Sequence, residues 1–154
     1  MKKMLGWGLL GFALFSLLYA GWLTFSNSNE KTGTGTQTVP DGTVVVYFIH
    51  GRAKCPTCDL ILAHTRKTLE TTFAEETRTG RLVLVQVDVE KPGNEHFMED
   101  FNLFTTSVVL YAKKRDGEPF WRNLDKAWEL AEDEDAYKAY FSDSLRLFLE
   151  EAGA

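Results

Sequence analysis

A pair of cysteines between a predicted strand and a predicted helix constrains this chain most strongly. Cys55 and Cys58 are its only cysteines, and they follow an apolar, β-branched run at residues 44–49. A short run without alternation is typical of a strand buried on both faces. Pro56 suits the first position of the helix that follows, where a missing N–H costs nothing. On the first turn of that helix both sulfurs lie on one face, where they can close a small disulfide ring.

The segment after the cysteines has the periodicity of an amphipathic helix. Its mostly apolar stripe, with spacings of four and three residues, consists of Cys58, Leu62, Thr65, Leu69 and Phe73. This stripe places Cys58 on the buried face of the helix and leaves Cys55 one turn earlier, at the exposed end. We expect the helix to end near residues 79–80.

The rest of the chain alternates strand and helix patterns. We expect, in order, a strand at residues 81–89, a helix at 95–103, strands at 107–112 and 118–121, a short helix at 124–130 and a helix at 135–151. The order β-α-β-α-β-β-α makes the first two strands parallel and the last two an antiparallel hairpin. The predicted fold class is therefore α/β, with a mixed central sheet and helices on both faces. The cysteines then lie at the carboxyl end of a central strand, where α/β sheets place their sites.

The N-terminal segment predicts a membrane anchor. Residues 4–26 contain no charged side chain, and about 22 helical residues span on the order of 33 Å, enough for a bilayer core of about 30 Å. Lys2 and Lys3 should hold the N-terminus in the cytoplasm. A cleaved signal peptide is the alternative, and the length of the apolar run favours an uncleaved anchor.

The domain organisation follows from this pattern. Residues 1–26 form the anchor or signal sequence, residues 27–42 a flexible polar linker, and residues 43–154 the folded domain. We expect a single-pass protein of the cell membrane, with residues 4–25 in the lipid bilayer. Its C-terminal domain would lie on the periplasmic or extracytoplasmic side, where disulfides persist. The net charge of −5, without a clustered basic face, argues against a nucleic-acid partner.

The position of Cys55 at a helix N-terminus favours redox chemistry. The free N–H groups and the partial positive charge there stabilise a thiolate and lower the thiol pKa, and Arg52 and Lys54 just upstream would add to this effect. Attack by Cys55 on a substrate disulfide would give a mixed disulfide, which Cys58 would resolve. If the chain is an enzyme, the expected activity is that of a thiol-disulfide oxidoreductase.

Two other interpretations of the cysteine pair stay open. A static disulfide would close only a small ring, which removes little chain entropy. A zinc site needs four ligands, and beside the two sulfurs the chain offers only three histidines, His50, His64 and His96. Copper(I) needs only two thiolates. We expect no resident metal, a solvated His64, and positions in the core for Trp121 and Trp128.

The order of elements together with Cys55-Pro56-Thr57-Cys58 resembles the thioredoxin-like superfamily over residues 43–152. The chain more narrowly resembles a bacterial family, the F-type subunits of nitrophenyl compound nitroreductase, in the stretches Tyr47-Phe48-Ile49-His50-Gly51, Cys55-x-x-Cys58, Asn94-Glu95-His96-Phe97, Ser107-Val108-Val109-Leu110 and Asn123-Leu124-Asp125-Lys126-x-Trp128. This resemblance implies a membrane-associated protein partner or partner reductase, in a system that reduces nitroaromatic or arsenical compounds. A non-enzymatic alternative is a thioredoxin-like binding subunit or copper(I) carrier that uses the same cysteines. The sequence shows no flavin or nicotinamide site, and no cofactor is expected.

The sequence departs from the thioredoxin pattern beside the predicted site. Thioredoxins carry a cis-proline before the third strand, and Thr106 occupies about the matching position here. Because a cis bond before a residue other than proline costs about 3 kcal/mol, we expect a trans peptide. Lys54 replaces the aromatic residue that often precedes the first cysteine. Lys54, Pro56, Thr57 and Thr106 are thus supporting residues, and the missing proline weighs against general disulfide-reductase activity.

Overall fold

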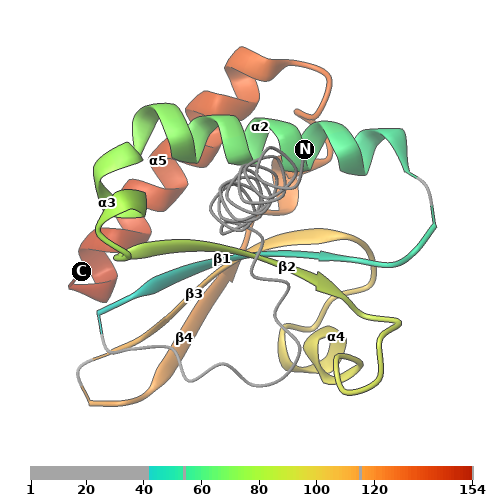
Figure 1. Ribbon diagram of the computed structural model, residues 1–154, viewed down its shortest axis with the longest axis horizontal. Coiled ribbons are helices and arrows are strands. Elements are labelled where there is room, and N and C mark those ends of the chain that lie inside the picture. The colour runs from blue at the N-terminus through green and yellow to red at the C-terminus, as the bar shows by residue number, and fades with distance from the viewer. Residues whose placement is uncertain (1–41, 54, 115, 154) are drawn as a thin grey trace, which may run out of the picture. The chain divides into compact units, whose positions relative to one another are not determined.

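The computed structural model describes residues 42–53, 55–114 and 116–153 (Figure 1). The predicted anchor at residues 1–26, the linker up to residue 41 and Lys54 lie outside these ranges. In the part of the chain that the structure describes, no helix combines the length and the apolar character needed to cross a bilayer. The anchor and the linker therefore stay predictions.

Within the described ranges, four strands form one mixed sheet in the order β2-β1-β3-β4. The strands are β1 (Val44–His50), β2 (Leu82–Asp88), β3 (Ser107–Lys113) and β4 (Pro119–Asn123). β1 pairs parallel with β2 and antiparallel with β3, and β3 pairs antiparallel with β4. The predicted strand directions are confirmed, and β1 occupies a central position.

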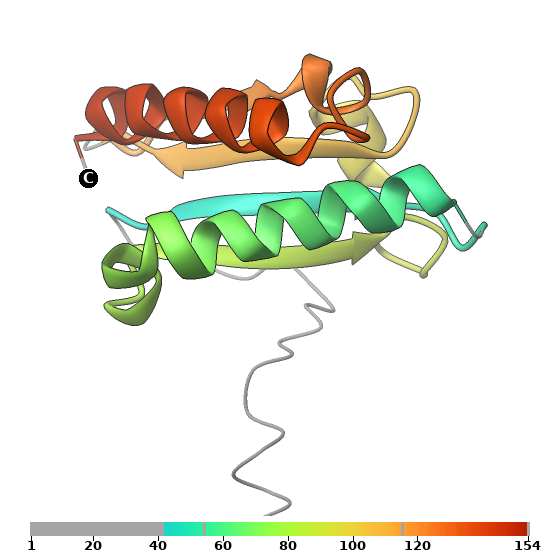
Figure 2. The ribbon, with the colours of Figure 1, turned by 90° about the horizontal axis from the view of Figure 1, so that it is seen from above.

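Helices cover both faces of the sheet, as predicted. They are α2 (Pro56–Thr72), α3 (Ala74–Arg78), α4 (His96–Asp100) and α5 (Glu134–Ala152), with a 3₁₀ turn, η1 (Asp125–Ala127). α2 and α5 lie side by side across one face, and α4 lies on the other (Figure 1, Figure 2). The predicted α/β fold, with its β-α-β-α-β-β-α order of elements, is therefore confirmed.

The two faces of the sheet carry two separate hydrophobic clusters. Successive residues of a strand point to opposite faces. In β1, Val44, Val46 and Phe48 belong to the cluster with α2 and α5, whereas Val45 and Ile49 belong to the cluster with α4. All five side chains are buried, which explains why this run shows no apolar-polar alternation. β2 divides between the faces as predicted, with its leucines in the first cluster and its valines in the second.

The first helical segment is interrupted, although one continuous helix was predicted. α2 ends at Thr72, and Phe73, with φ −120° and ψ 33°, separates it from α3. The ring of Phe73 is buried in the cluster beneath α2 and lies 5.7 Å from the guanidinium of Arg146 on α5. Burial of this ring fixes the break in the helical path. Gly80, with a positive φ of 77°, then allows the turn into β2.

α5 completes the layer over the first face. Its N-cap, Asp133, accepts a hydrogen bond from the amide of Ala136 at 3.0 Å, in agreement with the capping role predicted for the acidic run. Its buried face includes the predicted stripe of Tyr137, Phe141, Leu145, Phe148 and Leu149. The short helix predicted at residues 124–130 is shorter than expected, because only the 3₁₀ turn η1 forms and non-helical turns follow it.

Candidate active site

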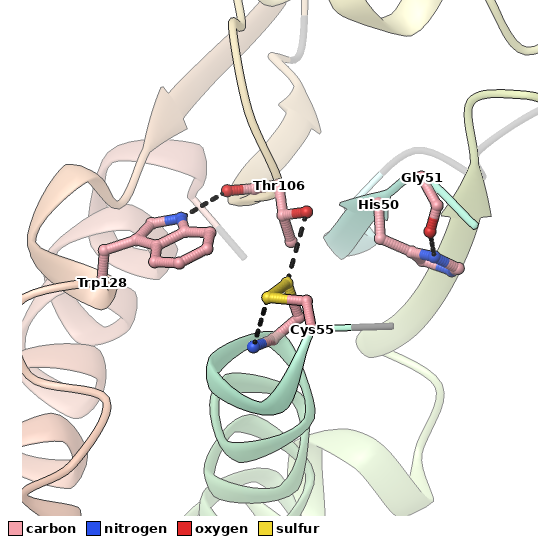
Figure 3. The surroundings of a disulfide bond; sticks show 6 residues. His50, Gly51, Cys55, Thr106 and Trp128 are labelled. Atoms are coloured by element: carbon pink, nitrogen blue, oxygen red, sulfur yellow. Dashed lines mark hydrogen bonds between the residues drawn. A yellow bond between two sulfur atoms is a disulfide. The ribbon is translucent and has the colours of Figure 1, made fainter. Parts of the chain in front are cut away.

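The cysteine pair lies at the carboxyl end of the central strand, as predicted. β1 ends at His50, a short loop follows, and Cys55 caps the N-terminus of α2. A disulfide joins Cys55 to Cys58, whose Cα atoms are 5.1 Å apart (Figure 3). Pro56 and Thr57 begin α2, so both supporting residues lie inside the ring that the disulfide closes.

The two sulfurs differ in accessibility. Cys58 lies on the buried stripe of α2 and is 9% exposed, whereas Cys55 is half-buried at the end of the helix. The predicted difference between the two cysteines is confirmed. Because thiol-disulfide exchange depends on access to the sulfur under attack, Cys55 is the sulfur open to an incoming thiolate.

Each sulfur has a hydrogen-bond donor of its own. The backbone amide of Cys58 donates to Cys55 Sγ at 3.2 Å, and this contact is the side-chain cap of α2. The hydroxyl oxygen of Thr106 lies 3.6 Å from Cys58 Sγ. Because a disulfide sulfur carries no hydrogen, the hydroxyl is the donor in this second contact. Both contacts strengthen when the sulfur becomes a thiolate, since a charged acceptor forms a stronger hydrogen bond.

Thr106 reaches the disulfide from the loop that precedes β3. The described residues contain no cis peptide bond, so the bond before Thr106 is trans, as predicted. Its backbone carbonyl accepts a hydrogen bond of 2.7 Å from Nε1 of Trp128 (Figure 3). The expectation that Thr106 faces the cysteines rested on the family resemblance, and the structure brings them together.

Trp121 and Trp128 were predicted to lie in the core, and this prediction is wrong. Trp128 is 37% exposed and Trp121 is 41% exposed. Trp121 stands on β4, where its ring meets that of Phe101 edge-on at 5.5 Å. Trp128 follows η1, in which Ala127 is the buried residue, and its indole remains at the surface beside the loop of Thr106. Sequence analysis missed its link to Thr106 because no local pattern relates two residues so far apart in the chain.

Arg52 is engaged by carboxyl and carbonyl groups, although we expected it to act on the sulfurs. Its amide donates to Glu90 Oε1 at 2.8 Å, and its guanidinium contacts Asp88 Oδ2 at 3.4 Å and the Glu90 carbonyl at 3.1 Å. Loss of hydration raises the pKa of Asp88, but hydrogen bonds from the Glu90 amide and from Arg52 outweigh it and hold that pKa below its usual value. The charge of Arg52 is therefore partnered at the end of β2.

The three histidines each have a partner away from the sulfurs. His50 Nδ1 donates to the carbonyl of the following residue at 2.8 Å, and its ring points away from the disulfide (Figure 3). His64 is partly buried and donates from Nε2 to the Ala131 carbonyl at 3.1 Å, so the prediction of a solvated His64 is wrong. His96 Nδ1 lies 2.7 Å from Asp100 Oδ2. Among the residues that the structure describes, no three metal-binding side chains form a cluster.

A pocket of about 320 Å³ opens beside the disulfide. Its lining joins the ends of β1 and β2 to the first turns of α2, and consists of Phe48, His50, Gly51, Arg52, Ala53, Cys55, Cys58, Asp59, Leu62, Gln86 and Asp88. The half-buried sulfur of Cys55 is part of this lining. The pocket therefore provides room beside the accessible sulfur for a group that carries a second sulfur.

No family model matches the chain, and no curated protein matches it. Among solved structures, the Trx4 domain of ERdj5 is similar with a TM-score of 0.45 and 15% identity, over 68% of this chain and 81% of that one. ERdj5 form I has a TM-score of 0.45 and 16% identity, over 77% of this chain and 14% of that one. A thioredoxin from Thermus thermophilus has a TM-score of 0.36 and 18% identity, over 54% of this chain and 59% of that one. The fold assignment accordingly rests on the order and directions of the strands described above.

Proposed function

We propose that this chain carries out thiol-disulfide exchange at the Cys55–Cys58 pair. The observation that supports it most directly is a disulfide at the N-terminus of α2 with a half-buried outer sulfur and a buried inner one. This arrangement offers one sulfur to a partner and keeps the second one turn away, in position to resolve a mixed disulfide. A purely static bridge would add little stability here, because the chain entropy that a disulfide removes grows with the length of the loop it closes.

The exchange proceeds in two displacements. The Cys55 thiolate of the reduced pair attacks one sulfur of a substrate disulfide, the substrate S–S bond breaks, and the other substrate sulfur leaves as a thiolate. The Cys58 thiolate then attacks Cys55 Sγ, and the substrate sulfur bound there leaves with the electron pair of the broken bond. The substrate gains two electrons and the Cys55–Cys58 bond is restored, whereas the reverse sequence oxidises a dithiol.

Single-cysteine variants of the full-length chain test this proposal. Reduced Cys58→Ser protein mixed with oxidised glutathione should retain glutathione on Cys55, because the resolving sulfur is absent. Cys55→Ser keeps only the buried sulfur and should form the adduct more slowly, by a factor on the order of ten. Intact-mass spectrometry measures both adducts over time. Equal rates in the two variants, or no adduct in either, would refute the proposal.

We also propose that the domain is tethered to the extracytoplasmic face of the cell membrane. The support is the uncharged segment at residues 4–26 with Lys2 and Lys3 before it. An alkaline wash of membranes, which removes peripheral proteins, should leave the full-length chain behind. A Leu10→Arg/Leu14→Arg variant, which places two charges in the apolar segment, should be released. Release of the unaltered chain would contradict the anchor.

A membrane-associated partner in nitroaromatic or arsenical reduction is proposed from the sequence motifs alone. Such a partner should form a covalent adduct with the Cys58→Ser chain, because exchange stops at the mixed disulfide. The adduct should be sensitive to dithiothreitol and should be absent with Cys55→Ser. An adduct of equal yield with both variants would show that contact with the partner does not proceed through Cys55.

A further inference from the structure

Thr106 connects the buried sulfur to Trp128. Its hydroxyl donates to Cys58 Sγ across 3.6 Å, and its carbonyl accepts from Trp128 Nε1 across 2.7 Å (Figure 3). We propose that Thr106 and Trp128 act together as positioning residues that stabilise the Cys58 thiolate when the disulfide opens. This inference rests on the proposed exchange function and assigns the two side chains a role at the same site.

The surroundings of Cys58 explain why a donor there matters. The backbone amide of Cys58 is directed to the other sulfur, Cys55 Sγ. Cys58 itself belongs to the hydrophobic cluster under α2, where loss of hydration disfavours a charged thiolate. The Thr106 hydroxyl offsets that penalty, since a hydrogen bond to a charged sulfur is stronger than one to a neutral sulfur. The hydroxyl therefore stabilises the open pair more than the closed disulfide.

Trp128 is placed to hold the Thr106 loop against the sulfur. The indole has a single N–H donor, and that donor is directed at the Thr106 carbonyl. Leu124 and Ala127, just before Trp128, are buried and anchor this segment in the core. On the other side, Thr106 is followed directly by Ser107, which is paired with β1 at the start of β3. The loop is thus fixed by the sheet on one side and by the indole on the other.

The two donors act at successive steps of the exchange. When an external thiolate attacks Cys55 Sγ, the disulfide breaks and its electron pair goes to Cys58 Sγ, beside the Thr106 hydroxyl. When a second external thiolate attacks the other sulfur of the mixed disulfide, the electron pair goes to Cys55 Sγ, beside the Cys58 amide. The pair is thereby reduced by two electrons, and the two external thiols are oxidised to a disulfide. Loss of the Thr106 hydroxyl affects the first of these steps.

Substitutions at Thr106 in the full-length chain test its role. Thr106→Val removes the hydroxyl with little change of shape, Thr106→Ser keeps it, and Thr105→Val makes the same change at the exposed neighbouring position. The equilibrium constant for reduction by glutathione should fall about tenfold in Thr106→Val, the size expected for one hydrogen bond to a charged group, and this corresponds to a potential lower by about 30 mV. Thr106→Ser and Thr105→Val should stay near the unaltered protein.

Trp128→Phe separates a positioning role from a general structural one. This substitution keeps an aromatic ring and removes the N–H donor, so the equilibrium constant should fall by a smaller factor than in Thr106→Val. The effect should disappear in a Thr106→Val background, because Trp128 acts through Thr106. Equal effects of Trp128→Phe in both backgrounds would refute the coupling.

A second measurement does not depend on exchange. In a Cys55→Ser background the ultraviolet absorbance of the thiolate follows the ionisation of Cys58 as the pH rises. Thr106→Val should shift this titration about one pH unit upward for a tenfold effect, whereas Thr106→Ser should not. The charged and titratable groups that line the adjoining pocket, His50, Arg52, Asp59 and Asp88, are the same in these variants, so their influence cancels.

The two measurements distinguish the inference from the function on which it rests. An unshifted Cys58 titration together with an unchanged glutathione equilibrium in Thr106→Val overturns the role of Thr106. A shifted titration in a protein whose disulfide does not react with glutathione supports the hydrogen bond and refutes the exchange function.

Discussion

The hydroxyl oxygen of Thr65 lies 2.7 Å from the phenol oxygen of Tyr137, and this buried contact joins α2 to α5. Thr65 donates its own hydrogen to the carbonyl of Ile61, also at 2.7 Å, so the phenol is the donor in the contact between the helices. Tyr137 is 0% exposed, and its hydroxyl therefore depends on Thr65. This contact holds the helix of the cysteine pair against the C-terminal helix.

Removal of the Thr65 hydroxyl should cost more stability than removal of the Tyr137 hydroxyl. Thr65→Val leaves a buried phenol without an acceptor and should lower the free energy of unfolding by about 1–3 kcal/mol, whereas Tyr137→Phe should cost about 1 kcal/mol. The double variant should cost less than the sum of the two. Urea unfolding measures all three. A larger cost for Tyr137→Phe than for Thr65→Val would contradict the assignment of the donor.

Alkaline pH should destabilise the fold through Tyr137. Burial raises the pKa of Tyr137 from 10.0 to about 12, although the hydrogen bond with Thr65 opposes this shift. A group with a raised folded-state pKa contributes stability that is fully present below the unfolded value of 10.0 and is lost as the pH rises toward about 12. The loss should approach about 3 kcal/mol. Urea unfolding across this range should show a flatter decline in Tyr137→Phe, and parallel declines would contradict the prediction.

Ser142 should tolerate the loss of its hydroxyl. Its side chain is 4% exposed, and its Oγ has no hydrogen-bond partner among the residues that the structure describes. Ser142→Ala removes a buried polar group without breaking a hydrogen bond, so stability should stay unchanged or rise by up to about 1 kcal/mol. Thermal unfolding measures the change, with Thr65→Val as the contrasting loss of a bonded hydroxyl. A clear loss of stability in Ser142→Ala would be inconsistent with an unpaired Oγ.

Gly51 leaves room for the carboxylate that holds the loop before the cysteines. A Cβ atom at this position would lie 2.9 Å from Glu90 Oε1, the oxygen that accepts from the Arg52 amide. Gly51→Ala should displace Glu90 and lower the free energy of unfolding by about 1 kcal/mol, the value of one hydrogen bond. In a Glu90→Ala background the substitution should have little further effect. The same cost in both backgrounds, measured by urea unfolding, would show that Glu90 is not the cause.

Local periodicity was sufficient to predict the order of elements, because helices and strands bury their faces with different repeats. The strand predicted at residues 44–49 is Val44–His50, and the helix predicted at 135–151 is Glu134–Ala152. The errors concern tertiary packing. Phe73 breaks the first helix where its ring enters the core, and the continuous apolar spacing of that segment contains no sign of the break.

The candidate site was predictable where it is local. Cys55 and Cys58 lie one helical turn apart, so their pairing and the difference in their exposure follow from the helix alone. The partners of Arg52 stand at the end of β2, and Trp128 reaches Thr106 from beyond β4. These contacts depend on how distant segments pack, which no local pattern in the sequence encodes.

Reversible exchange of the Cys55–Cys58 disulfide with external thiols is the central claim, and a redox titration tests it most directly. The full-length chain is equilibrated in a series of glutathione buffers, alkylated, and measured by intact-mass spectrometry. We predict one reversible two-electron transition, with both cysteines alkylated on the reducing side and neither on the oxidising side. A disulfide that stays closed across the whole series, or that opens and does not re-form, would contradict the claim.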